Sequence, residues 1–174
     1  TAIGAVEFCE VPEGTCDCDG TLPTQCWDGS TTCNNDCPAF FNVEISETGE
    51  STLFIFQDTI EGLDAGDELG VYDANGTLDS TGAMGEILVG SGVWTGSQLE
   101  IVGIQAVDLS QFGGPILPGA NEGNTMSLKV FKLSDQMTYD VTYGIGSGTG
   151  TFNGLFTAIE SVEFAPDYTV VINE

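Results

Sequence analysis

The sequence predicts an all-β protein, an antiparallel β-sandwich or jelly-roll-like fold preceded by a disulfide-stapled loop module. From residue 39 onward, about nine short runs rich in β-branched and aromatic residues alternate with Gly, Asn, Asp and Pro turn signals. No segment keeps a helical period long enough to predict a helix. All six cysteines lie within the first 37 residues. We therefore expect residues 1–38 to hold a short strand and the acidic disulfide-rich module, and residues 39–174 to form the sandwich, ending in a strand at 165–174.

Composition limits the partners of the chain. The 174 residues are enough for one domain with its own core, and a hydrophobic content of 41% excludes intrinsic disorder. Twenty-seven acidic residues against two basic ones, Lys129 and Lys132, give a net charge of −25. Such a surface repels phosphate, which excludes nucleic acid and anionic membranes as partners. The same charge repels other copies of the chain, so we expect a salty medium, bound cations, or both.

The cysteine module follows a short apolar segment, Ala2 to Phe8, which is a strand candidate. Residues 9–38 offer almost nothing for a core beyond Leu22 and Trp27, so crosslinks must hold these loops together. An even number of cysteines in a short acidic segment indicates disulfides and an oxidising compartment, although six cysteines allow 15 pairings. Zinc is the alternative ligand of the thiols, but the chain has no histidine and the flanks are rich in competing aspartates. The cysteines are Cys9, Cys16, Cys18, Cys26, Cys33 and Cys37.

Two further absences in the sequence bear on location. The chain has neither a leader-like segment nor a run of about 18 apolar residues. We therefore expect a mature exported protein, extracellular or at the cell surface, that does not insert into a membrane.

Strand candidates follow the module at short spacing. They are residues 40–45, 51–60, 68–73, 86–95, 98–109, 125–133, 137–143, 151–164 and 168–172. Thr95-Gly96-Ser97 separates two of these runs and predicts a β-hairpin. The second arm, 98–109, is apolar on both faces for much of its length, which predicts a strand in the middle of the two layers. Tyr139, Val141 and Tyr143 alternate with polar residues, which predicts a strand with one wet face.

Calcium is the predicted ligand, because a hard cation prefers oxygen and this chain has no histidine and, once crosslinked, no thiol to offer. Carboxylates and an amide recur at alternate positions before a glycine in two loops. The candidate ligands are Asp17, Asp19, Asp73, Asn75 and Asp79. Neither loop completes an EF-hand pattern, and each has an ordinary alternative: a solvated loop for the first and an Asn-Gly hairpin turn for the second. A third acidic cluster, Asp64, Asp67 and Glu68, is expected to be a solvated turn.

Catalytic chemistry finds little support in the sequence, and we expect a protein that is not an enzyme. Without histidine there is no Ser-His or Cys-His pair, and the thiols are expected to be oxidised. The glycine-rich stretch from Gly144 to Gly150 lacks the spacing of a phosphate-binding loop and precedes no helix. Trp27 and Trp94 could stack on a sugar ring, although packing inside the fold is the favoured role of such aromatic residues.

Short motifs carry a resemblance to a group of exported proteins. The pattern Cys16-Asp-Cys18-Asp-Gly20, continued by Cys26, Cys33 and Cys37, resembles the Cys/Asp/Gly modules of secreted surface proteins of marine bacteria. The run from Asp64 to Asp73, with Leu88-Val-Gly-Ser-Gly and Leu128-Lys-Val-Phe later in the chain, is similar to the β-domains found beside those modules. The resemblance implies export, an all-β fold and an extracellular or cell-surface role, with no activity attached.

The two ends of the chain suggest a function. An apolar strand at a terminus tends to pair with an open sheet edge, its own or that of a neighbour. The residues expected to form such assembly strands are Ile3, Val6, Tyr168, Val170 and Ile172. Head-to-tail strand donation would build a homopolymer, a filament, sheath or surface layer, with calcium offsetting the charge. The alternative is a cell-surface adhesin or carbohydrate-binding module that binds glycans.

Overall fold

The structure is a computed structural model that describes residues 11–17, 19–34 and 37–164. The chain divides into two compact units, Thr1–Phe40 and Phe41–Glu174. We call the first the disulfide unit and the second the sheet unit. Each unit is described by itself below.

Two crosslinks and one small ladder organise the disulfide unit. Disulfides join Cys16 to Cys33 and Cys26 to Cys37. Strands β1 (Thr24–Gln25) and β2 (Thr31–Thr32) pair antiparallel between them. These bonds confirm disulfides at four of the six cysteines and exclude zinc binding by those four thiols. Cys9 and Cys18 lie outside the described residues.

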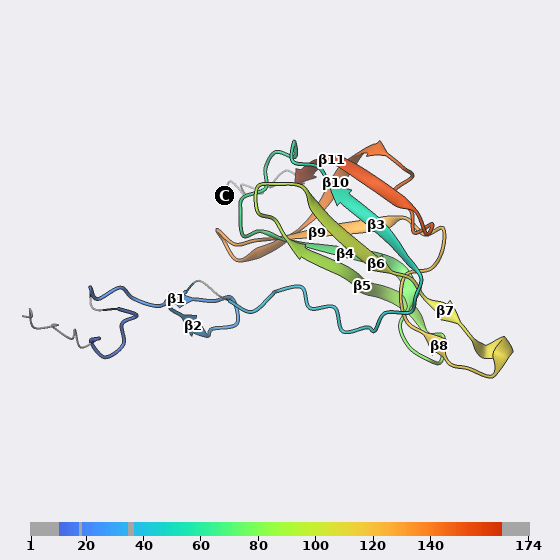
Figure 1. The fold of residues 1–174 in the computed structure, drawn as a ribbon, viewed down its shortest axis with the longest axis horizontal. Helices are drawn as coiled ribbons and strands as arrows, with labels where there is room; N and C mark the ends of the chain where they lie inside the picture. Colours follow the sequence, from blue (N-terminus) through green and yellow to red (C-terminus); the bar gives the residue numbers. More distant parts are fainter. Residues whose placement is uncertain (1–10, 18, 35–36, 165–174) are drawn as a thin grey trace, which may run out of the picture. The chain divides into compact units, whose positions relative to one another are not determined.

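One seven-stranded sheet forms the sheet unit (Figure 1). Its strands are β3 (Ser51–Phe56), β4 (Glu68–Thr77), β5 (Met84–Val93), β6 (Leu99–Ile104), β9 (Met126–Lys132), β10 (Met137–Ser147) and β11 (Phe156–Phe164). The strand order is β5-β4-β9-β10-β11-β3-β6. All neighbours pair antiparallel except β11 and β3, which run parallel. The predicted all-β, mostly antiparallel and sandwich-like class is confirmed.

The core lies inside this folded sheet. It is built from large apolar side chains contributed by every long strand, with two phenylalanines, Phe54 and Phe152, packed edge to face at 5.4 Å between ring centroids. Strand β10 presents Tyr139, Val141 and Tyr143 half-buried, while Thr138 and Thr142 are exposed. The predicted one-sided exposure of this strand is therefore confirmed.

The predicted hairpin around Thr95-Gly96-Ser97 is wrong. Strands β5 and β6 are consecutive in sequence, but they sit at the two opposite ends of the strand order, and no backbone ladder joins them. Strand β6 is also not central: Ile101 is buried, whereas Val102 is 53% exposed. The prediction failed because apolar residues on both faces of this segment suggested that both faces are buried. In the structure β6 is an end strand of the sheet, and one of its faces is exposed.

Several predicted boundaries also differ. Residues 40–45 form no strand, and the run 98–109 breaks after Ile104 into a separate short strand, β7 (Val107–Asp108), which pairs with β8 (Ile116–Leu117). A single 3₁₀ turn, Ser110–Phe112, joins β7 to β8. Strand β4 continues through the Asn75-Gly76 pair instead of turning there, and a β-bulge between Asp73 and Gly76 absorbs the irregularity.

Candidate functional site

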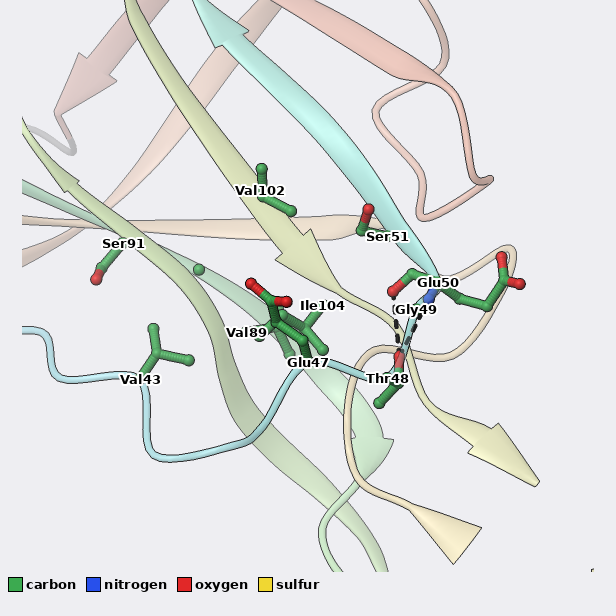
Figure 2. Close-up of a pocket in the computed structure, with 11 residues that line it drawn as sticks. Val43, Glu47, Thr48, Gly49, Glu50, Ser51, Val89, Ser91, Val102 and Ile104 are labelled. Carbon is green, nitrogen blue, oxygen red and sulfur yellow. Dashed lines mark hydrogen bonds between the residues drawn. The ribbon is translucent and has the colours of Figure 1, made fainter. Parts of the chain in front are cut away.

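A groove of about 480 Å³ opens where the two edge strands of the sheet come together. We call it the edge groove. It is lined by residues of β5, β6, the first residue of β3 and the loop before β3 (Figure 2). These residues are Val43, Glu47, Thr48, Gly49, Glu50, Ser51, Val89, Gly90, Ser91, Val102 and Ile104.

Glycines on β5 set the shape of the edge groove. A Cβ atom at Gly90 would lie 2.5 Å from the carbonyl oxygen of Val102, and one at Gly92 would lie 3.1 Å from a Leu99 methyl group. The absence of side chains therefore allows β5 to press directly onto β6 at these positions. Gly90 and Val102, which form one of these close contacts, both line the groove.

The loop that forms the floor of the groove is anchored to the sheet. The Thr48 hydroxyl donates to the carbonyl oxygen of Gln105 at 2.6 Å, and the backbone N–H of Gln105 donates to the carbonyl of Glu50 at 3.0 Å. The buried Thr52 hydroxyl in turn donates to the side-chain oxygen of Gln105 at 3.1 Å. Because these bonds join residues 48–52 to Gln105, more than 50 residues away, this lining loop is held in place on the sheet.

The lining combines apolar side chains with small ones and a carboxylate rim. Val43, Val89, Val102 and Ile104 supply the apolar surface, and Glu47 and Glu50 supply carboxylates (Figure 2). Both strands that flank the groove have one edge without a hydrogen-bonded neighbour strand in the described sheet. A groove of mixed polar and apolar lining beside strand edges without a hydrogen-bonded neighbour is suited to an extended peptide, whose main chain can pair while its apolar side chains contact the valines and the isoleucine.

The structure places the predicted calcium ligand Asp73 in a different environment. Its side chain is only 1% exposed, and its carboxylate accepts hydrogen bonds from the backbone N–H groups of Asn75 and Asn121 and from the side-chain amide of Asn124. Sequence reasoning missed the two partners Asn121 and Asn124, because nothing in the local pattern connects them to Asp73. Carboxylate oxygens already surrounded by N–H donors serve to hold the chain together.

Of the other predicted ligands, Asn75 is an exposed residue of β4, whereas Asp17, Asp19 and Asp79 lie in bends or turns. Asp79 accepts from the backbone and hydroxyl groups of Thr81, and the Thr81 side chain is the main cause that lowers the pKa of Asp79. Asp17 accepts from the backbone N–H groups of Thr21 and Asp19, and Thr21 likewise lowers the pKa of Asp17. Among the described residues, no three His, Cys, Asp or Glu side chains gather closely enough to hold a metal ion.

The acidic cluster expected to be a solvated turn is not solvated at its centre. Asp67 is fully buried and forms an ion pair of 2.7 Å with Lys132, whose ammonium group also contacts the exposed Asp64 at 2.9 Å. Glu68 is also largely buried, and its carboxylate accepts from the backbone N–H of Phe41 at 3.1 Å. Lys132 lies 65 residues from Asp67, which is why the local pattern did not reveal the pairing.

The two tryptophans differ in exposure. Trp94 is 2% exposed and belongs to the core of the sheet unit, so it is unavailable for stacking on a sugar. Trp27 in the disulfide unit is 38% exposed, packs edge to face on Phe40 and donates to the carbonyl of Pro38.

The predicted assembly-strand residues Ile3, Val6, Tyr168, Val170 and Ile172 lie outside the described residues. In the part of the chain that the structure describes, no helix is long and apolar enough to cross a membrane. The disulfides indicate an oxidising environment.

Comparison with protein-family models, with curated proteins and with solved structures found no match to this chain. The class of protein is therefore defined by its fold and its groove. It is an all-β protein in which a disulfide unit precedes a single folded sheet whose two end strands flank a groove of mixed polar and apolar lining.

Proposed function

We propose that this chain is an extracellular structural protein, a subunit of a filament, sheath or surface layer that assembles by strand donation and is aided by calcium. The observation that carries the proposal is that the two end strands of the sheet, β5 and β6, flank a groove whose lining includes three valines and an isoleucine. Open edges of this kind pair with any compatible strand unless they are covered. A subunit whose strand fills the groove of its neighbour would pair with these edges. It would thereby also prevent them from pairing with other strands.

The proposed occupant is the C-terminal segment of a second copy. Tyr168, Val170 and Ile172 fall on one side of an extended strand, and Pro166 separates this segment from the preceding residues. The apolar side of such a strand matches the valine and isoleucine lining of the edge groove. A contact from one end of a copy to the sheet of the next does not close on itself and therefore propagates.

Calcium enters the proposal through charge. The net charge is −25, and both lysines are already paired with carboxylates of the sheet unit, Lys129 with Glu86 and Lys132 with Asp64 and Asp67. The exposed Glu47 and Glu50 of the groove would face the carboxylate of Glu174 on the incoming segment. A divalent cation between these carboxylates offsets their repulsion, as oxygen-rich calcium sites do elsewhere.

The test is the size of the protein in solution. We expect light scattering and negative-stain microscopy to show assemblies with calcium, and smaller species after chelation or after deletion of residues 167–174. Val102→Glu, in the groove, should abolish assembly. Val93→Glu is the matched control, because Val93 is a similarly exposed valine on β5 that does not line the groove, at 47% against 53% for Val102. A protein that stays monomeric under all conditions would contradict the proposal.

A cell-surface adhesin or carbohydrate-binding module is the second candidate. The partly exposed ring of Trp27 is the observation that favours it, since a ring held by a hydrogen bond and an aromatic neighbour can offer a flat face to a sugar. This candidate predicts a monomer whose binding to a glycan array is lost in Trp27→Ala. The same substitution should leave calcium-dependent assembly unchanged if the structural role is correct.

A further inference from the structure

The Lys132–Asp67 pair is the most enclosed contact between oppositely charged side chains in the described part of the chain. The Lys132 side chain is 14% exposed and that of Asp67 is 1% exposed. The ammonium nitrogen lies 2.7 Å from Oδ2 of Asp67, 2.9 Å from Oδ2 of Asp64 and 3.0 Å from the carbonyl oxygen of Gly62. All three of its protons are therefore directed at named acceptors.

The surrounding residues fix the positions of the Asp67 carboxylate and the Lys132 ammonium group. Asp67 also accepts from the backbone N–H groups of Asp64 and Leu133, at 2.8 and 3.1 Å, so both of its oxygens are fixed. Lys132 ends β9, directly beside the start of β4, where Phe131 pairs with Glu68. The ring of Phe164 covers the ammonium group at 5.5 Å from the ring centroid. The amine thus meets a buried, fixed carboxylate, and a second carboxylate, the 77% exposed Asp64, lies within reach on the solvent side.

We propose that Lys132 and Asp67 condense spontaneously to an amide, an intramolecular crosslink between the start of β4 and the end of β9. One proton passes from Nζ to Oδ2 of Asp67, leaving a neutral amine and a neutral acid. The nitrogen lone pair then attacks Cγ, and the C–N bond forms. The bond from Cγ to Oδ2 breaks, and that oxygen leaves as water with the second proton of Nζ, relayed by Asp64. An ammonium and a carboxylate thereby become one amide and one water, with no other reactant.

Two physical arguments support this chemistry. Groups held at contact distance react with effective concentrations on the order of 10⁵–10⁸ M, which offsets the tendency of water to hydrolyse an amide. Charge is costly at a carboxylate as buried as Asp67, which is 1% exposed, so proton transfer to the neutral pair is less unfavourable there than in water. Burial is the largest influence on the pKa of Lys132 and lowers it, but its bonds to Asp67 and Asp64 outweigh burial and raise the pKa overall. The ion pair is therefore the resting state, and a slow reaction is expected.

Lys129 provides the internal comparison. It is the only other lysine, and it pairs at 2.7 Å with Glu86, whose side chain is 50% exposed. No second carboxylate contacts Lys129 at hydrogen-bond distance in the described structure, and Glu86 is far more exposed than Asp67, the buried partner of Lys132. The geometry assigns the crosslink to Lys132 and not to Lys129.

Mass spectrometry of the whole, reduced and alkylated protein tests the proposal. The expected mass is that of the fully alkylated sequence less one water, and Lys132→Arg should show the full mass of its own alkylated sequence while keeping the positive charge. Lys129→Arg, the matched control, should still lack one water. Asp64→Asn should slow the loss of water if Asp64 relays the proton, and an unchanged rate would overturn that role. If the protein without substitutions still shows the mass of its full sequence after prolonged incubation in the folded state, the crosslink proposal is overturned.

Trypsin gives an independent readout, because Lys129 and Lys132 are the only cleavage sites in the chain. In the denatured crosslinked protein, cleavage after Lys129 leaves the two pieces joined through Lys132 and Asp67, and the modified Lys132 is not cut. Separate fragments from the protein without substitutions would contradict the crosslink. Both readouts are made on the denatured single chain, so they test the crosslink whether or not the protein assembles.

Discussion

The side-chain amide of Asn124 donates to both carboxylate oxygens of Asp73, at 3.0 and 2.9 Å, across 51 residues of sequence. The same amide reaches the backbone carbonyl of Asn75 at 3.2 Å. One side chain therefore fixes the bulged part of β4 and satisfies a buried charge. The carboxylate of Asp73, which the sequence predicted as a calcium ligand, accepts hydrogen bonds from within the fold.

We expect Asn124→Ala to destabilise the sheet unit by about 1–3 kcal/mol, because it removes donors to a buried carboxylate. The urea midpoint should fall with little change in the slope of the transition. Asn153→Ala is the control, since the Asn153 side-chain amide donates to an exposed hydroxyl, that of Thr149. Equal losses in the two variants would show that the contact to Asp73 carries no special weight.

The glycine contact between β5 and β6 makes a second prediction. Gly90→Ala places a Cβ 2.5 Å from the backbone oxygen of Val102, which cannot give way as a flexible side chain would. We expect a loss of roughly 1–3 kcal/mol in the free energy of unfolding. Amide hydrogen exchange in β6 should also accelerate, because the strands must separate. Ser91→Ala, at the next residue, should change stability by less than about 0.5 kcal/mol, and a similar effect of both substitutions would contradict this account.

Reduction of the disulfides should affect the two units differently. The crosslinked pairs Cys16–Cys33 and Cys26–Cys37 close loops with sequence separations of 17 and 11, and native disulfides of this kind typically stabilise by about 2–4 kcal/mol. Cys26 is the only buried hydrophobic residue in the described part of the disulfide unit, so little besides the disulfides stabilises this unit. We expect reductant to expose residues 11–34 to proteolysis. The urea midpoint of the sheet unit should stay unchanged, because it contains no cysteine; a shift in that midpoint would refute the prediction.

The sequence was sufficient for the fold class and for the faces of single strands. The alternation of Tyr139, Val141 and Tyr143 correctly predicted their half-buried face, because the period of a strand is a local property. The turn at Thr95-Gly96-Ser97 was equally visible, but a turn does not determine whether its two arms share hydrogen bonds. Here the remaining strands intervene between β5 and β6 in the sheet order.

The candidate site depended on contacts that no local pattern encodes. The motif around Asp73 showed the chemical type of the residue, but Asn121 and Asn124 lie 48 and 51 residues away. The same is true of Asp67, which looked like part of a solvated turn until Lys132 was found against it. Burial of a charged residue follows from the topology of the sheet, and one sequence without its strand order does not reveal it.

Acid should weaken one further contact in a way that can be measured at a single residue. The Tyr139 hydroxyl donates to Asp135 at 2.6 Å, and this bond is the main cause that lowers the pKa of Asp135 below its ordinary value of 3.8. A lowered pKa means that the folded state prefers the ionised carboxylate. The stabilisation is therefore present above the unfolded-state pKa and is lost as the pH falls through the lower, folded-state pKa.

Tyr139→Phe removes that donor, so the pKa of Asp135 should rise toward its ordinary value in an NMR titration of the carboxyl carbon. The stability difference between the unmodified protein and the variant should narrow below about pH 4, where the carboxyl of both folded and unfolded chains becomes protonated. Asp79 serves as the internal control, because Thr81 and not a tyrosine holds its carboxylate, so its titration should not move. An unchanged pKa of Asp135 in the variant would assign the shift to the backbone N–H of Met137, which lies 3.0 Å from the other carboxylate oxygen.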